Sequence, residues 1–185
     1  MSETAPGVVP LEDQLRHALR VYARRTPLHA ALAAEFSTLV DDAEDPFRRE
    51  RPEGHFTASA WLVSADGQRV LLTHHRKLDR WLQLGGHADG DRDLAAVALR
   101  EAEEESGLDG LVLDDPAILD LDKHWIPARA DVPGHWHYDV RFRVRATGSE
   151  QFRVSDESLA LAWRDIAALV ADPDTDESLR RMAGR

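Results

Sequence analysis

The sequence predicts a layered fold of the α/β or α+β type, with two helices ahead of it. Three observations support this prediction. Residues 93–106 have the apolar periodicity of a helix. Segments rich in β-forming residues precede and follow this helix in the sequence. Residues 11–40 also have helical periodicity. The length of 185 residues suits one domain with a terminal extension, and the hydrophobic share of 43% is enough for a sizeable core.

The N-terminal part is predicted to form a helical extension. Residues 1–10 resemble a loose tail, and apolar residues at helical spacing predict a helix over 11–25 that Pro27 ends. A second helix is expected over 28–40. We therefore divide the chain into an extension, residues 1–45, and a main domain, residues 46–185. The helix pair is interpreted as a packing element or a homodimer element.

The main domain should begin with a hairpin. Strands are expected over residues 55–64 and 69–74, joined by an Asp66-Gly67 turn, and residues 81–84 lead into a turn at Gly85-Gly86. Alternating polar and apolar residues predict a strand over 138–145. Short helices are expected over 164–170 and 176–182.

Charge and cysteine content restrict the function. The formal net charge of −11 makes the chain a poor general binder of nucleic acid or of an anionic membrane. The absence of cysteine excludes disulfides, thiolate nucleophiles and cysteine-ligated zinc. Without a signal peptide or a long apolar run, the chain is expected to be cytoplasmic, with neither nucleic-acid nor membrane partners.

The helix over residues 93–106 combines an apolar stripe with carboxylates. Leu94, Val97 and Ala98 form the stripe. Continued towards the C-terminus, the same face carries three acids, Glu101, Glu104 and Glu105, whereas Glu103 points away. Oxygen ligands of this kind select Mg²⁺, Mn²⁺ or Ca²⁺, although a solvated acidic run is the plain alternative.

The spacing of these residues resembles a known motif. Arg100-Glu101-Ala102-Glu103-Glu104-Glu105-Ser106-Gly107-Leu108 fits REUxEExGU, where U is apolar, and Gly86 stands at the upstream glycine. The segment Gly86–Leu108 therefore resembles the Nudix box, GX5EX7REUXEEXGU. The resemblance implies an αβα sandwich with a mixed β-sheet. It also implies Mg²⁺- or Mn²⁺-dependent hydrolysis of a nucleoside diphosphate linked to another moiety.

The resemblance also implies roles for individual residues. Metal ligands would be Glu101, Glu104, Glu105 and the carbonyl of Gly85 or Gly86, with a further acid expected at Glu157, shortly before Trp163. Glu101 would also orient or deprotonate the attacking water. Arg100 would position the glutamates through ion pairs. The catalytic set implied by the motif is Glu101, Glu104, Glu105 and Arg100.

One position departs from the motif. The box expects glutamate where the chain has Arg92, at a place that serves the ion-pair scaffold. Asp89, Asp91 or Asp93 is expected to meet Arg100 instead. This departure puts the loop geometry in doubt, while activity is expected to survive.

Other clusters carry weaker signals. His75, Arg76 and Lys77 end a strand before the glycine pair and are candidates to bind substrate phosphate, as is Arg141; a basic strand end and a solvated sheet face are the alternatives. His135 and His137 would share a strand face, with His124 upstream, so a transition-metal site is a minority hypothesis.

Three functional hypotheses follow. The first is a Nudix hydrolase acting on a small nucleotide. The second, prompted by Arg92, is a non-catalytic Nudix-fold sensor or interaction module. The third is an enzyme similar to isopentenyl diphosphate isomerase, which the absence of cysteine argues against. The sequence does not identify the substrate.

Overall fold

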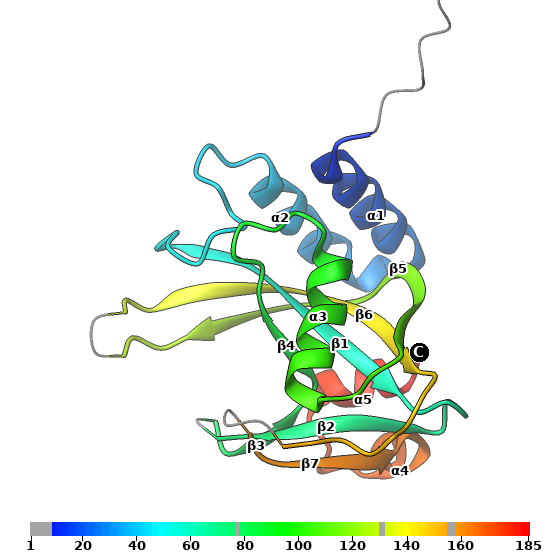
Figure 1. Ribbon diagram of the computed structural model, residues 1–185. Helices are drawn as coiled ribbons and strands as arrows, with labels where there is room; N and C mark the ends of the chain where they lie inside the picture. The colour runs from blue at the N-terminus through cyan, green and yellow to red at the C-terminus, as the bar shows by residue number, and fades with distance from the viewer. Residues whose placement is uncertain (1–8, 77, 130–131, 155–157) are drawn as a thin grey trace, which may run out of the picture.

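A computed structural model describes residues 9–76, 78–129, 132–154 and 158–185 (Figure 1). Over these residues the helices are α1 (Leu11–Arg25), η1 (Pro27–His29), α2 (Ala30–Val40), α3 (Leu94–Ser106), α4 (Ile166–Ala171) and α5 (Glu177–Ala183). The strands are β1 (Gly54–Val63), β2 (Arg69–His75), β3 (Arg80–Leu82), β4 (Leu84–His87), β5 (Leu111–Ile126), β6 (His135–Ala146) and β7 (Ser158–Asp165).

The seven strands of the described residues form one mixed sheet, ordered β3-β2-β1-β6-β5, with β4 paired to β1 and β7 to β2. Strand β1 is central: it runs parallel to β6 along its whole length and antiparallel to β4. It meets β2 only near its end, at Val63 and Val70. The expected mixed sheet with a helical N-terminal segment is therefore confirmed.

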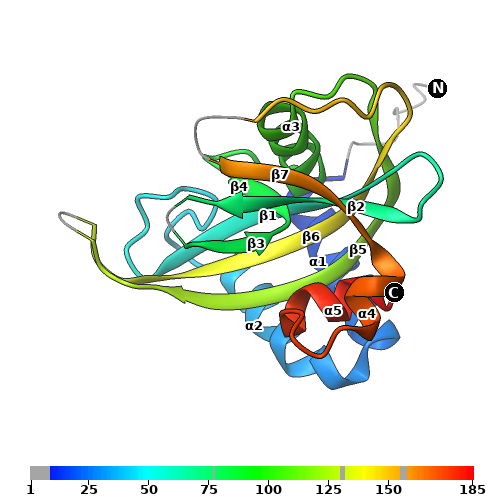
Figure 2. The same cartoon turned by 90° about the horizontal axis from the view of Figure 1, so that it is seen from below.

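Alternation along β1 and β6 gives the sheet two different faces. Phe56, Ala58 and Ala60 lie opposite Tyr138, Val140 and Phe142. All of these belong to one hydrophobic cluster that includes the apolar side of α3. Helices α4 and α5 cover a second cluster, built on the opposite face around Trp61 and Val63 (Figure 2). The helix layers on both sides of the sheet are those of an αβα sandwich.

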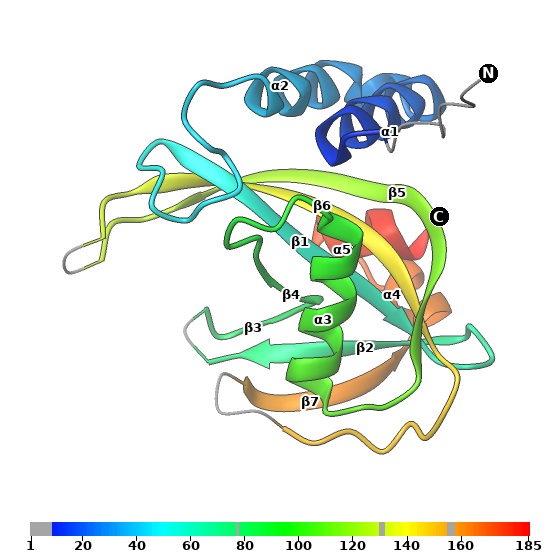
Figure 3. The ribbon, with the colours of Figure 1, turned by 45° about the horizontal axis from the view of Figure 1, so that its top comes forward.

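The N-terminal helices are part of the main core. Helices α1 and α2 lie beside β5 (Figure 3). Phe36 of α2 is fully buried, with its ring centroid 6.0 Å from that of Phe56 and 5.2 Å from that of Tyr138. The Tyr22 hydroxyl of α1 donates to Asp120 Oδ1 at 3.1 Å. The helix pair is thus a packing element, while its use in a homodimer stays a prediction.

The central helix begins and ends where local signals predict. The Asp93 side chain accepts a hydrogen bond from the Ala96 amide at 3.0 Å, which caps the first turn. Gly107 ends the helix in the left-handed conformation with φ of 63°. None of the helices within the described ranges combines the length and the apolar character that crossing a membrane requires.

Two local predictions were wrong. Gly85-Gly86 is part of strand β4 rather than a turn, because both residues pair with β1. The helix expected from residue 164 begins at Ile166, because Arg164 and Asp165 still pair with β2 in strand β7.

Truncation of Phe36 tests whether the extension is part of the core. We expect Phe36→Ala to lower the free energy of unfolding by about 3–5 kcal/mol, because it removes a buried ring. Leu28→Ala is the matched control, since Leu28 is 96% exposed, and it should change stability by no more than about 0.5 kcal/mol. Urea denaturation of both variants checks this, and equal effects would contradict the packing.

Candidate metal and active site

The candidate site lies where α3 meets the glycine strand β4. A Cβ atom at Gly86 would stand 2.5 Å from Cδ of Glu101, and one at Gly85 would stand 2.7 Å from the Ala58 carbonyl oxygen. Real side chains do not approach so closely, so glycine at position 85 lets β4 lie close to β1, and glycine at position 86 leaves room for the Glu101 carboxylate of α3. The Gly85 amide also donates to Glu105 Oε1 at 3.4 Å.

The glutamates of α3 differ in exposure. Glu101 and Glu105 are half-buried and turn towards β4, whereas Glu103 and Glu104 are exposed. Among the described residues, these acids do not form as compact a ligand cluster as the histidines described below. Carboxylates beside a backbone carbonyl form the all-oxygen donor set that suits Mg²⁺ or Mn²⁺.

Arg100 forms two ion pairs with carboxylates near the box loop. Its guanidinium lies 3.4 Å from Asp91 Oδ2 and 3.8 Å from Glu101 Oε1. Asp91 is thus the partner among the three aspartates considered, since Asp93 caps α3 and Asp89 pairs with Arg49. The hydrogen bond from Arg49 holds the pKa of Asp89 below its usual range.

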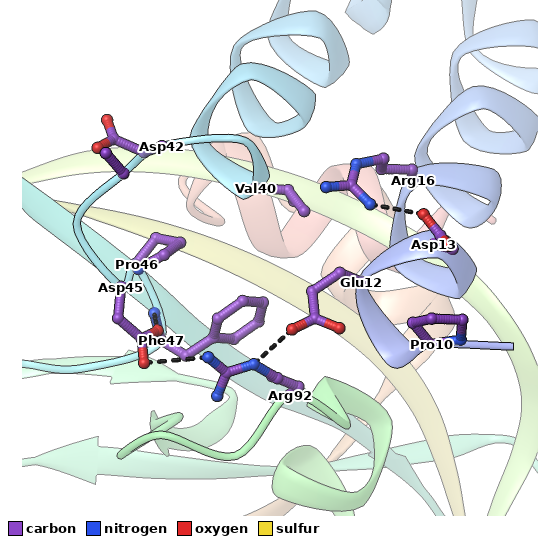
Figure 4. A pocket seen from close by; sticks show the side chains of 11 residues that line it. Pro10, Glu12, Asp13, Arg16, Val40, Asp42, Asp45, Pro46, Phe47 and Arg92 are labelled. Carbon is purple, nitrogen blue, oxygen red and sulfur yellow. Dashed lines mark hydrogen bonds and ion pairs between the residues drawn. The ribbon is translucent and has the colours of Figure 1, made fainter. Parts of the chain in front are cut away.

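Arg92 points towards Glu12 of α1 and Asp45 (Figure 4). It forms ion pairs with Glu12 of α1 and, at 3.1 Å, with Asp45 in the segment between α2 and β1, residues 41–53, which we call the linker. Its guanidinium also lies 5.2 Å from the centroid of the Phe47 ring. These groups border a cavity of about 420 Å³ between α1 and the linker. The departure from the motif therefore connects the box loop to the extension.

Two of the expected phosphate-binding residues, His75 and Arg76, lie at the end of β2. Arg76 donates to the Ser158 carbonyl at 3.1 Å, and the His75 Nδ1 accepts from the Leu78 amide at 3.4 Å. Lys77 and Glu157 lie outside the described residues. Contact of these residues with substrate or metal stays a prediction.

The prediction that Arg141 lies on a solvated face of the sheet is wrong. Arg141 is 2% exposed and forms ion pairs with three aspartates, at 2.8 Å to Asp139, 3.4 Å to Asp120 and 3.2 Å to Asp122. A buried guanidinium needs such partners, because desolvation of an unpaired charge is costly. Its expected contact with substrate stays a prediction.

The same network holds the C-terminal helix against the sheet. Arg181 of α5 donates to Asp120 Oδ2 at 2.8 Å and to Asp122 Oδ1 at 3.2 Å. Burial acts to raise the pKa of Asp122, but a hydrogen bond with His124 and the nearby arginines outweigh it and hold that pKa well below its usual range.

Sequence reasoning missed two histidines beside the expected three. His55 lies opposite His137 in the β1–β6 ladder, and His87 pairs next to it, opposite Thr57. Together with His124 and His135 they form a group of adjoining rings. The parallel pairing of β1 with β6 creates this group, and no local signal in the sequence indicates that pairing.

Comparison with known proteins identifies a family and several structures of similar fold. The family model for the NUDIX domain matches residues 54–183. A search of curated proteins found no match. Three solved structures illustrate the similarity in fold. The E. coli dihydroneopterin triphosphate pyrophosphohydrolase is 20% identical, with 74% of this chain and 94% of that chain covered and a TM-score of 0.52.

The other two are more distant in sequence. The MutT protein from Methanosarcina mazei is 18% identical, with 70% and 90% of the two chains covered and a TM-score of 0.52. The C. elegans Ap4A hydrolase is 15% identical, with 70% and 92% covered and a TM-score of 0.50. At identities this low, the similarity shows a shared fold and does not identify a substrate.

Charge reversal at Arg92 tests the connection to the extension. Arg92→Glu replaces two ion pairs and a cation–π contact by repulsion from Glu12 and Asp45, so we expect a loss of about 1–3 kcal/mol in the free energy of unfolding. Adding Glu12→Arg to this variant should restore part of the lost stability. Arg20→Glu, on the exposed side of α1, is the control, and an equal loss there would contradict the connection.

Proposed function

The chain belongs to the Nudix family, and from this premise we propose that it is a metal-dependent hydrolase that cleaves a diphosphate linkage in a nucleoside diphosphate derivative. The observation that carries the proposal is the packing of Glu101 and Glu105 against the glycine strand β4. A small nucleotide as substrate and a cytoplasmic location belong to the same proposal.

The donor set supports Mg²⁺ or Mn²⁺ as the cofactor. We propose that Glu101, Glu104 and Glu105 bind it with the carbonyl of Gly86, and that Glu157 adds a further carboxylate. When bound, such an ion neutralises the diphosphate and lowers the pKa of a coordinated water. No thiol or other covalent nucleophile is required, which agrees with a chain that lacks cysteine.

The protein side chains supply position and proton transfer. Glu101 is assigned to orient or deprotonate the attacking water, because its carboxylate is the one held against Gly86. Arg100 is assigned to hold Glu101 in place, since it contacts both Glu101 and Asp91. Binding of substrate phosphate is assigned to His75, Arg76 and Lys77. Arg141, on the polar face of the sheet, is assigned to the same role.

The observation that prompted the non-catalytic alternative has another explanation. It rested on Arg92, which stands where the motif has a glutamate. Arg92 contacts Glu12 and Asp45, and Asp91 serves Arg100 in place of the missing acid. The substitution therefore has an explanation that does not require loss of catalysis.

A substrate panel tests the proposed activity. Nucleoside triphosphates, nucleotide sugars and dinucleoside polyphosphates would be incubated with Mg²⁺ or Mn²⁺, and released nucleoside monophosphate measured by chromatography. The panel includes dihydroneopterin triphosphate and Ap4A, the compounds named for two proteins of similar fold. For dihydroneopterin triphosphate, which is not a nucleotide, released pyrophosphate is measured instead. We expect turnover of at least one compound. Tight binding without any turnover would favour the sensor, and neither binding nor turnover would contradict both.

Neutralising single glutamates tests the assignment of the site. We expect Glu104→Gln and Glu101→Gln each to lower kcat/KM by about 100-fold or more, because each removes a charged ligand. Glu103→Gln is the matched control, because Glu103 is exposed on the same helix and points away from the other acids. A Glu103→Gln loss equal to that of Glu104→Gln would contradict the assignment.

A methyl group at Gly86 tests the helix–strand contact. Gly86→Ala should displace the Glu101 carboxylate and reduce kcat strongly while leaving most of the chain folded, because the atoms in conflict are the far end of that side chain. Gly184→Ala is the control, since its Cβ would meet no atom closer than 3.5 Å. Wild-type kcat in Gly86→Ala would show that Glu101 does not need its present position.

A further inference from the structure

Five histidines from four strands meet at one end of the sheet, outside the carboxylate site. The ring centroids of His55 lie 5.2 Å from His87, 4.9 Å from His135 and 5.0 Å from His137. The ring of His124 lies 5.4 Å from that of His137. The proposed hydrolysis uses none of these side chains, so the cluster needs a separate explanation.

Three of these imidazoles are placed as metal ligands. One ligand nitrogen from each of His55, His135 and His137 lies within 4.8 Å of the other two, and within the described ranges this is the one group of three or more potential ligands gathered so closely. Imidazole nitrogens around a tetrahedral zinc ion at about 2.0–2.1 Å are separated by about 3.3 Å. The Nε2 atoms of His135 and His137 are 3.2 Å apart and form a hydrogen bond; this distance is close to one edge of that tetrahedron, so a bound ion would replace the shared proton.

Backbone carbonyls select the tautomer that metal binding requires. His135 Nδ1 lies 2.9 Å from the Pro133 carbonyl oxygen, and His55 Nδ1 lies 3.4 Å from that of Arg51. Because a carbonyl oxygen only accepts hydrogen bonds, each Nδ1 carries the proton and each Nε2 keeps its lone pair. Metal-bound histidines characteristically donate their second nitrogen to such a partner.

One nitrogen of the cluster has no protein partner. His55 is 2% exposed, and its Nε2 is a buried atom without a hydrogen bond. An unsatisfied buried acceptor destabilises the fold, so such atoms are rare and call for an explanation. A cation among the three imidazoles would satisfy this lone pair.

We propose that His55, His135 and His137 form a zinc-type transition-metal site, separate from the carboxylate site for Mg²⁺ or Mn²⁺. Nitrogen ligands favour Zn²⁺ over the hard cations that carboxylates select. Three protein ligands leave the fourth position of the tetrahedron to water, as in catalytic zinc sites. The ion would connect the start of β1 to the start of β6.

Calorimetric titration of Zn²⁺ into the full chain, stripped of metal with a chelator, tests the proposal. The titration uses the Glu101→Gln/Glu104→Gln background, so that the carboxylate site does not contribute. We expect one ion per chain and an increase of several degrees in Tm with Zn²⁺ in excess. Binding that persists in this background would also separate the site from the proposed hydrolase, whichever way the substrate panel turns out.

Variants then identify the ligands. In the same background, His135→Asn/His137→Gln should weaken Zn²⁺ binding by about 100-fold or more. Loss of a residue that only supports a metal ligand already costs about 10–100-fold in affinity, and this variant removes two direct ligands. His17→Gln, on the exposed side of α1, is the control and should bind as the parent does. Equal affinity of the double variant and the parent would overturn the proposal.

A measurement on the unaltered histidines covers the case in which the double variant does not fold. In ¹⁵N-labelled chain, Zn²⁺ should shift the Nε2 resonances of His55, His135 and His137, and leave that of His17 in place. Addition of Mg²⁺ alone should shift none of them. Unchanged imidazole resonances at saturating Zn²⁺ would overturn the proposal.

Discussion

The parallel pairing of β1 with β6 determines which side chains meet in the rest of the structure. Its register places Phe56, Ala58 and Ala60 on the face that receives α3, and His55, Thr57 and Ser59 on the other. The side chains opposite them extend each face: apolar residues on the helix side, and His137, Asp139 and Arg141 on the polar side. A slip of one residue would exchange the two faces and bury the polar set under α3.

Two physical requirements then fix the positions of the charged groups. Near the helix, the absence of a side chain at Gly86 leaves room for the Glu101 carboxylate, and the Gly85 amide donates to Glu105. On the polar face, Asp139 is 2% exposed and accepts hydrogen bonds from Thr57, Ser59 and Arg141. Buried carboxylates persist only with such partners, so the polar face is as tightly specified as the apolar one.

Features that depend on neighbours in sequence were predictable, and those that depend on strand pairing were not. The limits of α3 follow from its Asp93 cap and Gly107. The shared role of Glu101, Glu104 and Glu105 stays a prediction. Gly85-Gly86 was misassigned because glycine pairs usually indicate turns, whereas here Gly85 allows a close approach of β4 to β1 and Gly86 leaves room for the Glu101 side chain of α3. His55 and His137 are 82 positions apart in number, and only the β1–β6 register brings them together.

Strand β4 lies between the two proposed metal sites. Gly86 faces the Glu101 carboxylate, and His87, the next residue, has its ring centroid 5.0 Å from that of His137. Successive residues of a strand point to opposite faces, so one short segment contributes backbone to the carboxylate site and a ring to the histidine cluster. The packing of His87 against His55 and His137 restrains the backbone whose carbonyl is assigned to the Mg²⁺ or Mn²⁺ site. The loop that follows is held from the other side, where Arg92 contacts Glu12 and Asp45. The geometry of the box therefore depends on the histidine cluster before it and on the N-terminal extension after it.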